Sequence, residues 1–319
     1  MSFSYKVKAE LSTQFGNARH CNLSELSAFI NICGEILQET NYFCVKIQSE
    51  NLLVMKKCFT LLQNTFNINS EITETTNGSG RKAKSFILWI KNPSDVEKVL
   101  HATGIWTEVN QHPKIQNKMY APVVSSICCR RAYVRGAFLC AGSVNNPEKN
   151  YHLEFVVSSE QLAEQLKDLI NTFELDSKVV ARKDHFVVYL KEGEQIVNLL
   201  NVMEAHVALM DLENVRIVKE VRNDVNRRVN CETANLNKIV HAAVKQEEDI
   251  LLIQNTIGLE KLPPQLIEIA MLRLEYSDIS LKELGALLQE PVGKSGVNHR
   301  LKKISLIAES LREGKGEGL

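Results

Sequence analysis

The sequence of 319 residues lacks any apolar run near the ~18 residues that a membrane-spanning helix needs, so an integral membrane protein is not expected. Residues 1–10 lack the apolar core of a secretory signal, so export by a cleaved signal is not expected either. Net charge is lacking as well, because 38 Lys and Arg residues balance 38 Asp and Glu residues. The total charge therefore gives no ground for a nucleic-acid partner. The length and a hydrophobic content of 44% are typical of a soluble protein with two or three domains.

Metal-binding spacings are also lacking. The eight cysteines include no C-x-x-C pair, and the eight histidines include no H-x-x-x-H pair. Cys128 and Cys129 are adjacent, and several other cysteines lie in apolar runs, so we expect buried, reduced thiols, no metal site and no cofactor. His206 and His241 lie in apolar stretches and are expected to pack in a core.

Internal repeats run through the first 215 residues. Segment 26–34, Leu-Ser-Ala-Phe-Ile-Asn-Ile-Cys-Gly, is echoed 108 positions later by segment 134–142, Val-Arg-Gly-Ala-Phe-Leu-Cys-Ala-Gly. Three further echoes follow in the same order, pairing 64–68 with 171–175, 86–91 with 186–191, and 96–101 with 196–201. Four echoes in one order indicate a duplication, and two unrelated α/β segments of similar composition are the alternative.

Each half predicts a helix, two strands, a helix, two strands and a helix. Segments 43–48 and 153–157 have the pattern of strands, whereas 50–66 and 159–173 carry apolar residues at helical steps. The first helix of each half is rich in small residues that allow two backbones to approach closely on a pseudo-two-fold axis. These residues are Ser27, Ala28, Cys33 and Gly34 in one half, and Gly136, Ala137, Ala141 and Gly142 in the other. The predicted domain is a double α/β domain with halves 1–110 and 111–215.

This arrangement resembles the LAGLIDADG homing endonucleases, in which two motif helices pack beneath a saddle of strands that grips DNA. The resemblance implies an acidic metal ligand just before the last glycine of each motif. Those positions hold Cys33 and Ala141 here, and neither side chain is a ligand for a hard cation. Glu35 has Ser143 as its counterpart, so no carboxylate pair can be rebuilt and no catalytic residue is predicted.

A basic, asparagine-rich segment follows, predicted as a helical linker over 216–262. Between 216 and 245, the sequence has seven Lys and Arg residues but only three Asp and Glu residues. A solvated basic helix and a second nucleic-acid surface are both consistent with this pattern. The candidate residues for the second surface are Arg222, Asn226, Arg227, Arg228, Asn230, Asn235 and Lys238.

The segment 263–319 predicts a helix-turn-helix domain. Ser280 and Glu283 have the spacing of a capping box at the second short helix. The third helix begins near Ser295 and has four basic residues and no acids between 294 and 303. In this motif the third helix enters the major groove of DNA. A small helical bundle for protein contacts is the alternative. The candidate DNA-binding residues, over about 280–312, are Ser280, Lys282, Lys294, Ser295, Asn298, His299, Arg300, Lys302 and Lys303.

The whole chain resembles the WhiA family. The resemblance rests on three features. The two LAGLIDADG-like repeats lack the acidic metal ligands, residues 226–235 read Asn-Arg-Arg-Val-Asn-Cys-Glu-Thr-Ala-Asn, and residues 294–301 read Lys-Ser-Gly-Val-Asn-His-Arg-Leu. It implies an α+β fold and a cytoplasmic, nucleoid-associated bacterial regulator that binds double-stranded DNA and takes part in cell division, chromosome segregation and, in spore formers, sporulation. It also implies a terminal domain similar to the sigma-factor region that reads the −35 promoter element. RNA polymerase, a sigma factor or another regulator is an open further partner, and the oligomeric state is open.

Two other functions remain open from the sequence. One is a working metal-dependent LAGLIDADG-type endonuclease. The other is an adaptor whose N-terminal domain binds a protein or a small ligand rather than DNA.

Overall fold

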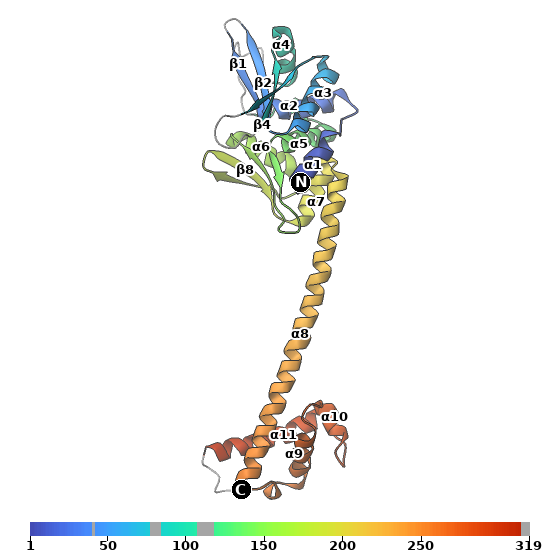
Figure 1. Ribbon diagram of the computed structural model, residues 1–319, viewed down its shortest axis with the longest axis vertical. Coiled ribbons are helices and arrows are strands. Elements are labelled where there is room, and N and C mark those ends of the chain that lie inside the picture. The colour runs from blue at the N-terminus through green and yellow to red at the C-terminus, as the bar shows by residue number, and fades with distance from the viewer. Residues whose placement is uncertain (40–41, 77–83, 107–117, 314–319) are drawn as a thin grey trace. The chain divides into compact units, whose positions relative to one another are not determined.

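The chain forms two compact units, Met1–Lys219 and Glu220–Leu319, called unit 1 and unit 2 below (Figure 1). The computed structural model describes residues 1–39, 42–76, 84–106 and 118–313. The predicted boundary between the two repeat halves, 110/111, lies outside these residues. Helix α8 (His206–Thr256) belongs to both units and begins before the predicted linker start at 216.

Unit 1 contains the predicted order of elements twice, after a short N-terminal helix α1 (Phe3–Ser12). A short 3-10 turn (Ala121–Val124) precedes the second repeat. The first repeat consists of α2 (Arg19–Cys33), β1 (Gly34–Gln38), β2 (Phe43–Ser49), α3 (Leu52–Phe66), β3 (Ile72–Thr76), β4 (Lys84–Ile90) and α4 (Pro93–Ala102). The second consists of α5 (Ile127–Ala141), β5 (Gly142–Val144), β6 (Leu153–Val157), α6 (Glu160–Asn171), β7 (Lys178–Arg182), β8 (His185–Leu190) and α7 (Gly193–Met203).

The two sheets of unit 1 have equivalent topologies. Their strand orders are β1-β2-β4-β3 and β5-β6-β8-β7, and every neighbouring pair is antiparallel. The equivalence extends to single backbone positions, because Asn67 and Glu174, which match in the 64–68 and 171–175 echoes, both have a left-handed φ, of 58° and 61°. The predicted α+β fold class and pseudo-two-fold duplication are confirmed.

The motif helices α2 and α5 pack against each other, and each also contacts the sheet of its own repeat (Figure 1). A Cβ atom at Gly136 would lie 2.7 Å from the backbone oxygen of Glu25 and 3.0 Å from Cβ of Ala28. No side chain fits there without a shift. The close contact between the two backbones therefore explains why small residues occur where α2 and α5 cross.

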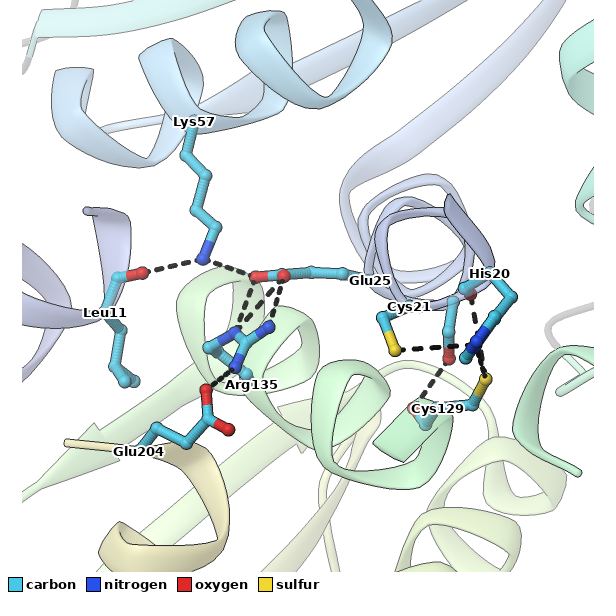
Figure 2. A network of polar contacts seen from close by, with 9 residues as sticks. Leu11, His20, Cys21, Glu25, Lys57, Cys129, Arg135 and Glu204 are labelled. Atoms are coloured by element: carbon cyan, nitrogen blue, oxygen red, sulfur yellow. Dashed lines mark hydrogen bonds and ion pairs between the residues drawn. The ribbon is translucent and has the colours of Figure 1, made fainter. Parts of the chain in front are cut away.

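A buried ion-pair network also joins the two motif helices (Figure 2). Glu25 on α2 accepts from Arg135 on α5 at 3.0 Å and from Lys57 on α3 at 2.6 Å, and all three side chains are almost fully buried. Lys57 also donates to the backbone oxygen of Leu11 at 2.7 Å, and Arg135 donates to Glu204 at 2.7 Å. Buried charges require such partners, so the network fixes the relative position of α2, α3 and α5.

Unit 2 packs the end of α8 against three further helices, α9 (Pro264–Glu275), α10 (Leu281–Ala286) and α11 (Lys294–Arg312). A 3-10 turn (Leu259–Lys261) lies between α8 and α9. The buried core takes apolar residues from all four helices, including Ile250 and Ile253 from α8.

Several smaller expectations were wrong or incomplete. His206 and His241 are exposed on α8 rather than packed in a core. All eight cysteines are free, but Cys128 and Cys231 are exposed.

Among the described residues, no helix is both long and apolar enough to span a membrane.

Candidate nucleic-acid interface

The helix α11 is placed by a short second helix and a tight turn. The backbone N–H of Glu283 donates to Ser280 Oγ at 3.3 Å, and the Ser280 N–H donates to Glu283 Oε2 at 2.9 Å, which completes the predicted capping box. Hydrogen bonds from the hydroxyl and the backbone N–H of Ser280 to the Glu283 carboxylate lower the pKa of Glu283 below its ordinary value. Ser280 is thus part of the helix start, and its hydroxyl is already bonded.

The turn between α10 and α11 depends on Gly285. The backbone N–H of Val292 donates to the Gly285 oxygen at 3.1 Å. A Cβ atom at Gly285 would lie 2.2 Å from the Val292 oxygen, so only glycine permits this approach. The turn directs the chain into α11, whose first residue is Lys294.

One exposed face of α11 collects most of the predicted contact residues. Ser295, Asn298, His299 and Lys302 are exposed and follow one another at i, i+3, i+4 and i+7, which places them on one side of a helix. The opposite side buries Val297, Leu301, Ile304 and Ala308. Polar side chains on this outer face are able to reach base edges in a groove.

The predicted cations differ in their surroundings. Lys282, Lys294, Lys302 and Lys303 are exposed, and none of them forms an ion pair within the part of unit 2 that the structure describes. Arg300 is half-buried and lies off the face that carries Asn298 and Lys302. Leu306, 61% exposed, continues that face beyond Lys302. The four lysines are free to neutralise phosphates.

Two polar contacts that the sequence did not reveal support this domain, and each involves one buried charged side chain. Arg312, at the end of α11, pairs with the fully buried Asp249 of α8 at 2.7 Å. Arg273 of α9 is 2% exposed and donates to the backbone oxygens of Ser277 and Ile279, in the turn before α10, and to Gln246 of α8. Nothing in the local spacing of these residues signals their partners.

The candidate second surface on α8 is not gathered on one face. All seven of its residues are exposed, as is every residue from 221 to 240. At 3.6 residues per turn, Arg222, Arg227 and Arg228 point to three different sides of the helix. Arg228 also pairs with Asp224 at 3.7 Å. The wide distribution favours general attraction to phosphates over base reading.

The C-terminal ends of α2 and α5 border a cleft of about 780 Å³. Lys8, Cys33, Cys140 and Ser143 are among its lining residues, and Glu50 is the one carboxylate among the described residues that line it. Glu35 pairs instead with Lys46 at 3.4 Å. Desolvation lowers the pKa of Lys8, and the Cys140 and Cys33 thiols oppose that shift. The described lining of this cleft thus combines one amine, two thiols and a single carboxylate.

Comparisons with known proteins cover both units. Family models described as the WhiA N-terminal LAGLIDADG-like domain, the WhiA LAGLIDADG-like domain and the WhiA C-terminal HTH domain match residues 19–106, 130–222 and 225–308. A protein of Lachnoclostridium phytofermentans named "Probable cell division protein WhiA" is 51% identical over 98% of this chain and 100% of its own. The chain belongs to the WhiA family. A relative of the same name from Clostridium botulinum is 48% identical, again over 98% of this chain and 100% of its own.

The solved structures agree with the observed fold. The crystal structure of "full-length DUF199/WhiA from Thermatoga maritima" superposes with a TM-score of 0.60 at 23% identity, covering 97% of this chain and 98% of that chain. The chain therefore shares its fold with a WhiA protein of quite different sequence.

Proposed function

We propose that this chain is a sequence-specific DNA-binding protein that regulates transcription and acts in cell division and chromosome segregation, without catalysis. The observation that carries the proposal is the outer face of α11, where Ser295, Asn298, His299 and Lys302 are exposed. The helix follows directly after the turn that the hydrogen bond from Val292 to Gly285 holds. A regulator of this kind works in the cytoplasm, associated with the nucleoid, and contacts double-stranded DNA. RNA polymerase, a sigma factor or another regulator is the further protein partner that this proposal leaves open.

Sequence specificity is tested with Asn298→Ala plus His299→Ala. Each lost base contact costs about 1–3 kcal/mol, so we expect binding to a selected operator duplex to weaken roughly tenfold or more and binding to random duplex to stay unchanged. Fluorescence anisotropy with the full chain measures both. Asn214→Ala plus His206→Ala, an exposed pair in unit 1, is the matched control. Equal losses on operator and random duplex would refute base reading by α11.

The competing function is a metal-dependent endonuclease. We expect supercoiled plasmid to stay intact with the full chain and Mg²⁺ or Mn²⁺, because the cleft lacks the carboxylate pair that two-metal cleavage needs. Cleavage by the wild type that disappears in Glu50→Gln or Glu35→Gln would establish an intrinsic nuclease and overturn the proposed function. Activity that persists in both variants would indicate a contaminating enzyme.

A further inference from the structure

Four metal-ligating side chains meet at the N-terminal ends of the two motif helices. His20 and Cys21 lie in the first turn of α2, and Cys128 and Cys129 lie in the first turn of α5. Their ligand atoms all lie within 4.8 Å of one another. His20 Nδ1 is 3.1 Å from Cys129 Sγ, 3.5 Å from Cys21 Sγ and 4.0 Å from Cys128 Sγ. Figure 2 marks the first two of these contacts.

The cluster follows the duplication of unit 1. The pair His20-Cys21 and the pair Cys128-Cys129 are separated by 108 positions, the same offset that relates segments 26–34 and 134–142. Each repeat therefore contributes two adjacent ligands from an equivalent place. Because α2 and α5 pack along each other, the two pairs point into one shared space. Spacing rules that search within one segment for C-x-x-C overlook such a site.

The donors and distances suit tetrahedral zinc. Zinc takes thiolate sulfur at about 2.3 Å and imidazole nitrogen at about 2.0–2.1 Å, so the edges of the tetrahedron are about 3.6 Å from nitrogen to sulfur and about 3.8 Å between sulfurs. The three distances from His20 Nδ1, 3.1, 3.5 and 4.0 Å, lie on either side of the first value. A set of one histidine and three cysteines fills all four positions, which is typical of a structural site rather than a catalytic one.

The surroundings hold the ligands in place. Ser24 Oγ donates to the backbone oxygen of Cys129 at 2.7 Å, inside the core, and Ser126 Oγ lies 3.2 Å from Cys128 Sγ. A Cβ atom at Gly16 would lie 2.7 Å from Cβ of Cys21, so the preceding loop closes tightly over that residue. Two helix N-termini also favour negative charge at this place, as thiolate ligands require.

We propose that His20, Cys21, Cys128 and Cys129 bind one zinc ion that fastens the two repeats of unit 1 together. Binding exchanges three thiol protons, released to solvent, for three sulfur–zinc bonds and one nitrogen–zinc bond, and no atom is oxidised or reduced. The site lies at the opposite end of α2 from Cys33, about 20 Å away along a 15-residue helix. It is therefore separate from the position at which the resemblance to homing endonucleases implies a metal ligand.

The test uses the full chain expressed and purified without chelators. Elemental analysis is expected to find one zinc ion per chain, and Cys128→Ser plus Cys129→Ser is expected to lose it. Cys231→Ser, which removes another exposed thiol far along the sequence, is the control and should keep the metal. Replacement of zinc by Co²⁺ should give the intense visible absorption of a tetrahedral thiolate complex, and chelator treatment should lower the melting temperature of the wild type but not of the double variant.

Every outcome decides the proposal. If the double variant fails to fold, cobalt titration of the metal-free wild type still reports on coordination. A wild-type chain that takes up neither zinc nor cobalt overturns the proposal. So does metal that remains in the double variant, or a mass spectrum showing that two of these cysteines are joined as a disulfide. An iron–sulfur chromophore in place of zinc would also overturn it.

Discussion

At the residue scale, Lys302 and Lys303 carry the electrostatic part of the proposed DNA contact. Both are exposed and without an acidic partner among the described residues of unit 2. A lysine that neutralises a phosphate releases a counterion, so its contribution appears in the salt dependence of binding. Polar residues that read bases leave that dependence unchanged, and the two roles can therefore be measured separately.

We expect Lys302→Ala plus Lys303→Ala to weaken binding to all duplexes alike and to reduce the slope of log affinity against log salt by about two. Fluorescence anisotropy titrations at several salt concentrations measure the slope. Lys56→Ala plus Lys149→Ala, two exposed lysines of unit 1, should leave it unchanged. An unaltered slope in the α11 variant would remove these lysines from the interface.

Lys57 gives the stability of unit 1 a dependence on pH. Burial lowers its pKa from 10.5 to about 8 in the folded chain, against the opposing effect of Glu25. Between these values the unfolded chain binds more protons than the folded chain, so the contribution of Lys57 to the free energy of unfolding rises with pH. Glu204 acts in the same sense as Glu25, and Arg135 acts in the opposite sense.

The difference in free energy of unfolding between the wild type and Lys57→Met should therefore increase from about pH 8 to about pH 10. Urea denaturation at a series of pH values measures it. Lys56→Met, on the same helix but exposed, should show a constant difference. A Lys57→Met difference that is flat or falls with pH would mean that burial does not depress the pKa of this lysine.

Single residues show what the sequence can reveal. The capping residues Ser280 and Glu283 were predictable because their partners are three positions apart. Glu25 and Arg135 are 110 positions apart, and no local pattern links them. His20, Cys21, Cys128 and Cys129 were missed, although applying the repeat offset of 108 to the cysteines would have paired them.

At the element scale, the helix-turn-helix depends on the turn at Gly285. Replacement by alanine forces its Cβ against the Val292 oxygen, and overpacking of this kind costs about 1–3 kcal/mol. Gly285→Ala should therefore lower the free energy of unfolding by roughly 2 kcal/mol and weaken DNA binding as α11 shifts. Chemical denaturation and anisotropy measure the two effects.

Gly293, the residue directly before α11, provides the control for this change. Gly293 has no atom within 4 Å of an added Cβ, so Gly293→Ala should change stability and DNA binding little. Equal effects of the two substitutions would show that loss of glycine flexibility, rather than the close approach at Gly285, matters in this turn.

Several helices and strands were predictable from the sequence, but the start of α8 was not. Apolar periodicity gave α3, α6 and the strands β2 and β6 to within about two residues. The start of α8 was placed too late, at 216 rather than His206. Its first turn is capped by Glu10, which accepts from the N–H groups of Val207 and Ala208, and this partner is almost 200 positions away. Contacts of that range have no local signature.

At the scale of the whole molecule, the zero net charge is an average over unlike parts. Segment 294–303 has four cations and no acids, and 216–245 has seven cations against three acids. DNA affinity depends on the local field and not on the sum, so the neutral total is compatible with a DNA-binding role. A neutral total with two local excesses favours binding at chosen sites over general coating of DNA.

The duplication was predictable because the repeated segments keep their order along the chain, and the missing carboxylate pair was predictable as well. The sequence shows Cys33 and Ala141 at the acid positions. The structure adds Lys8 from α1 to the same cleft and directs Glu35 to Lys46. Unit 1 thus has the LAGLIDADG-like architecture with no acid at the two positions where the resemblance implies metal ligands, and α11 has the exposed polar face on which the proposed reading of DNA sequence rests.

Chromatin immunoprecipitation across the genome tests this division of roles most directly. The full chain should occupy discrete sites that share a sequence motif, and Asn298→Ala plus His299→Ala should lose those sites while the protein remains present at normal levels. Identical occupancy of the wild type and the variant would contradict DNA reading by α11. Uniform coverage without a motif would contradict sequence-specific binding altogether.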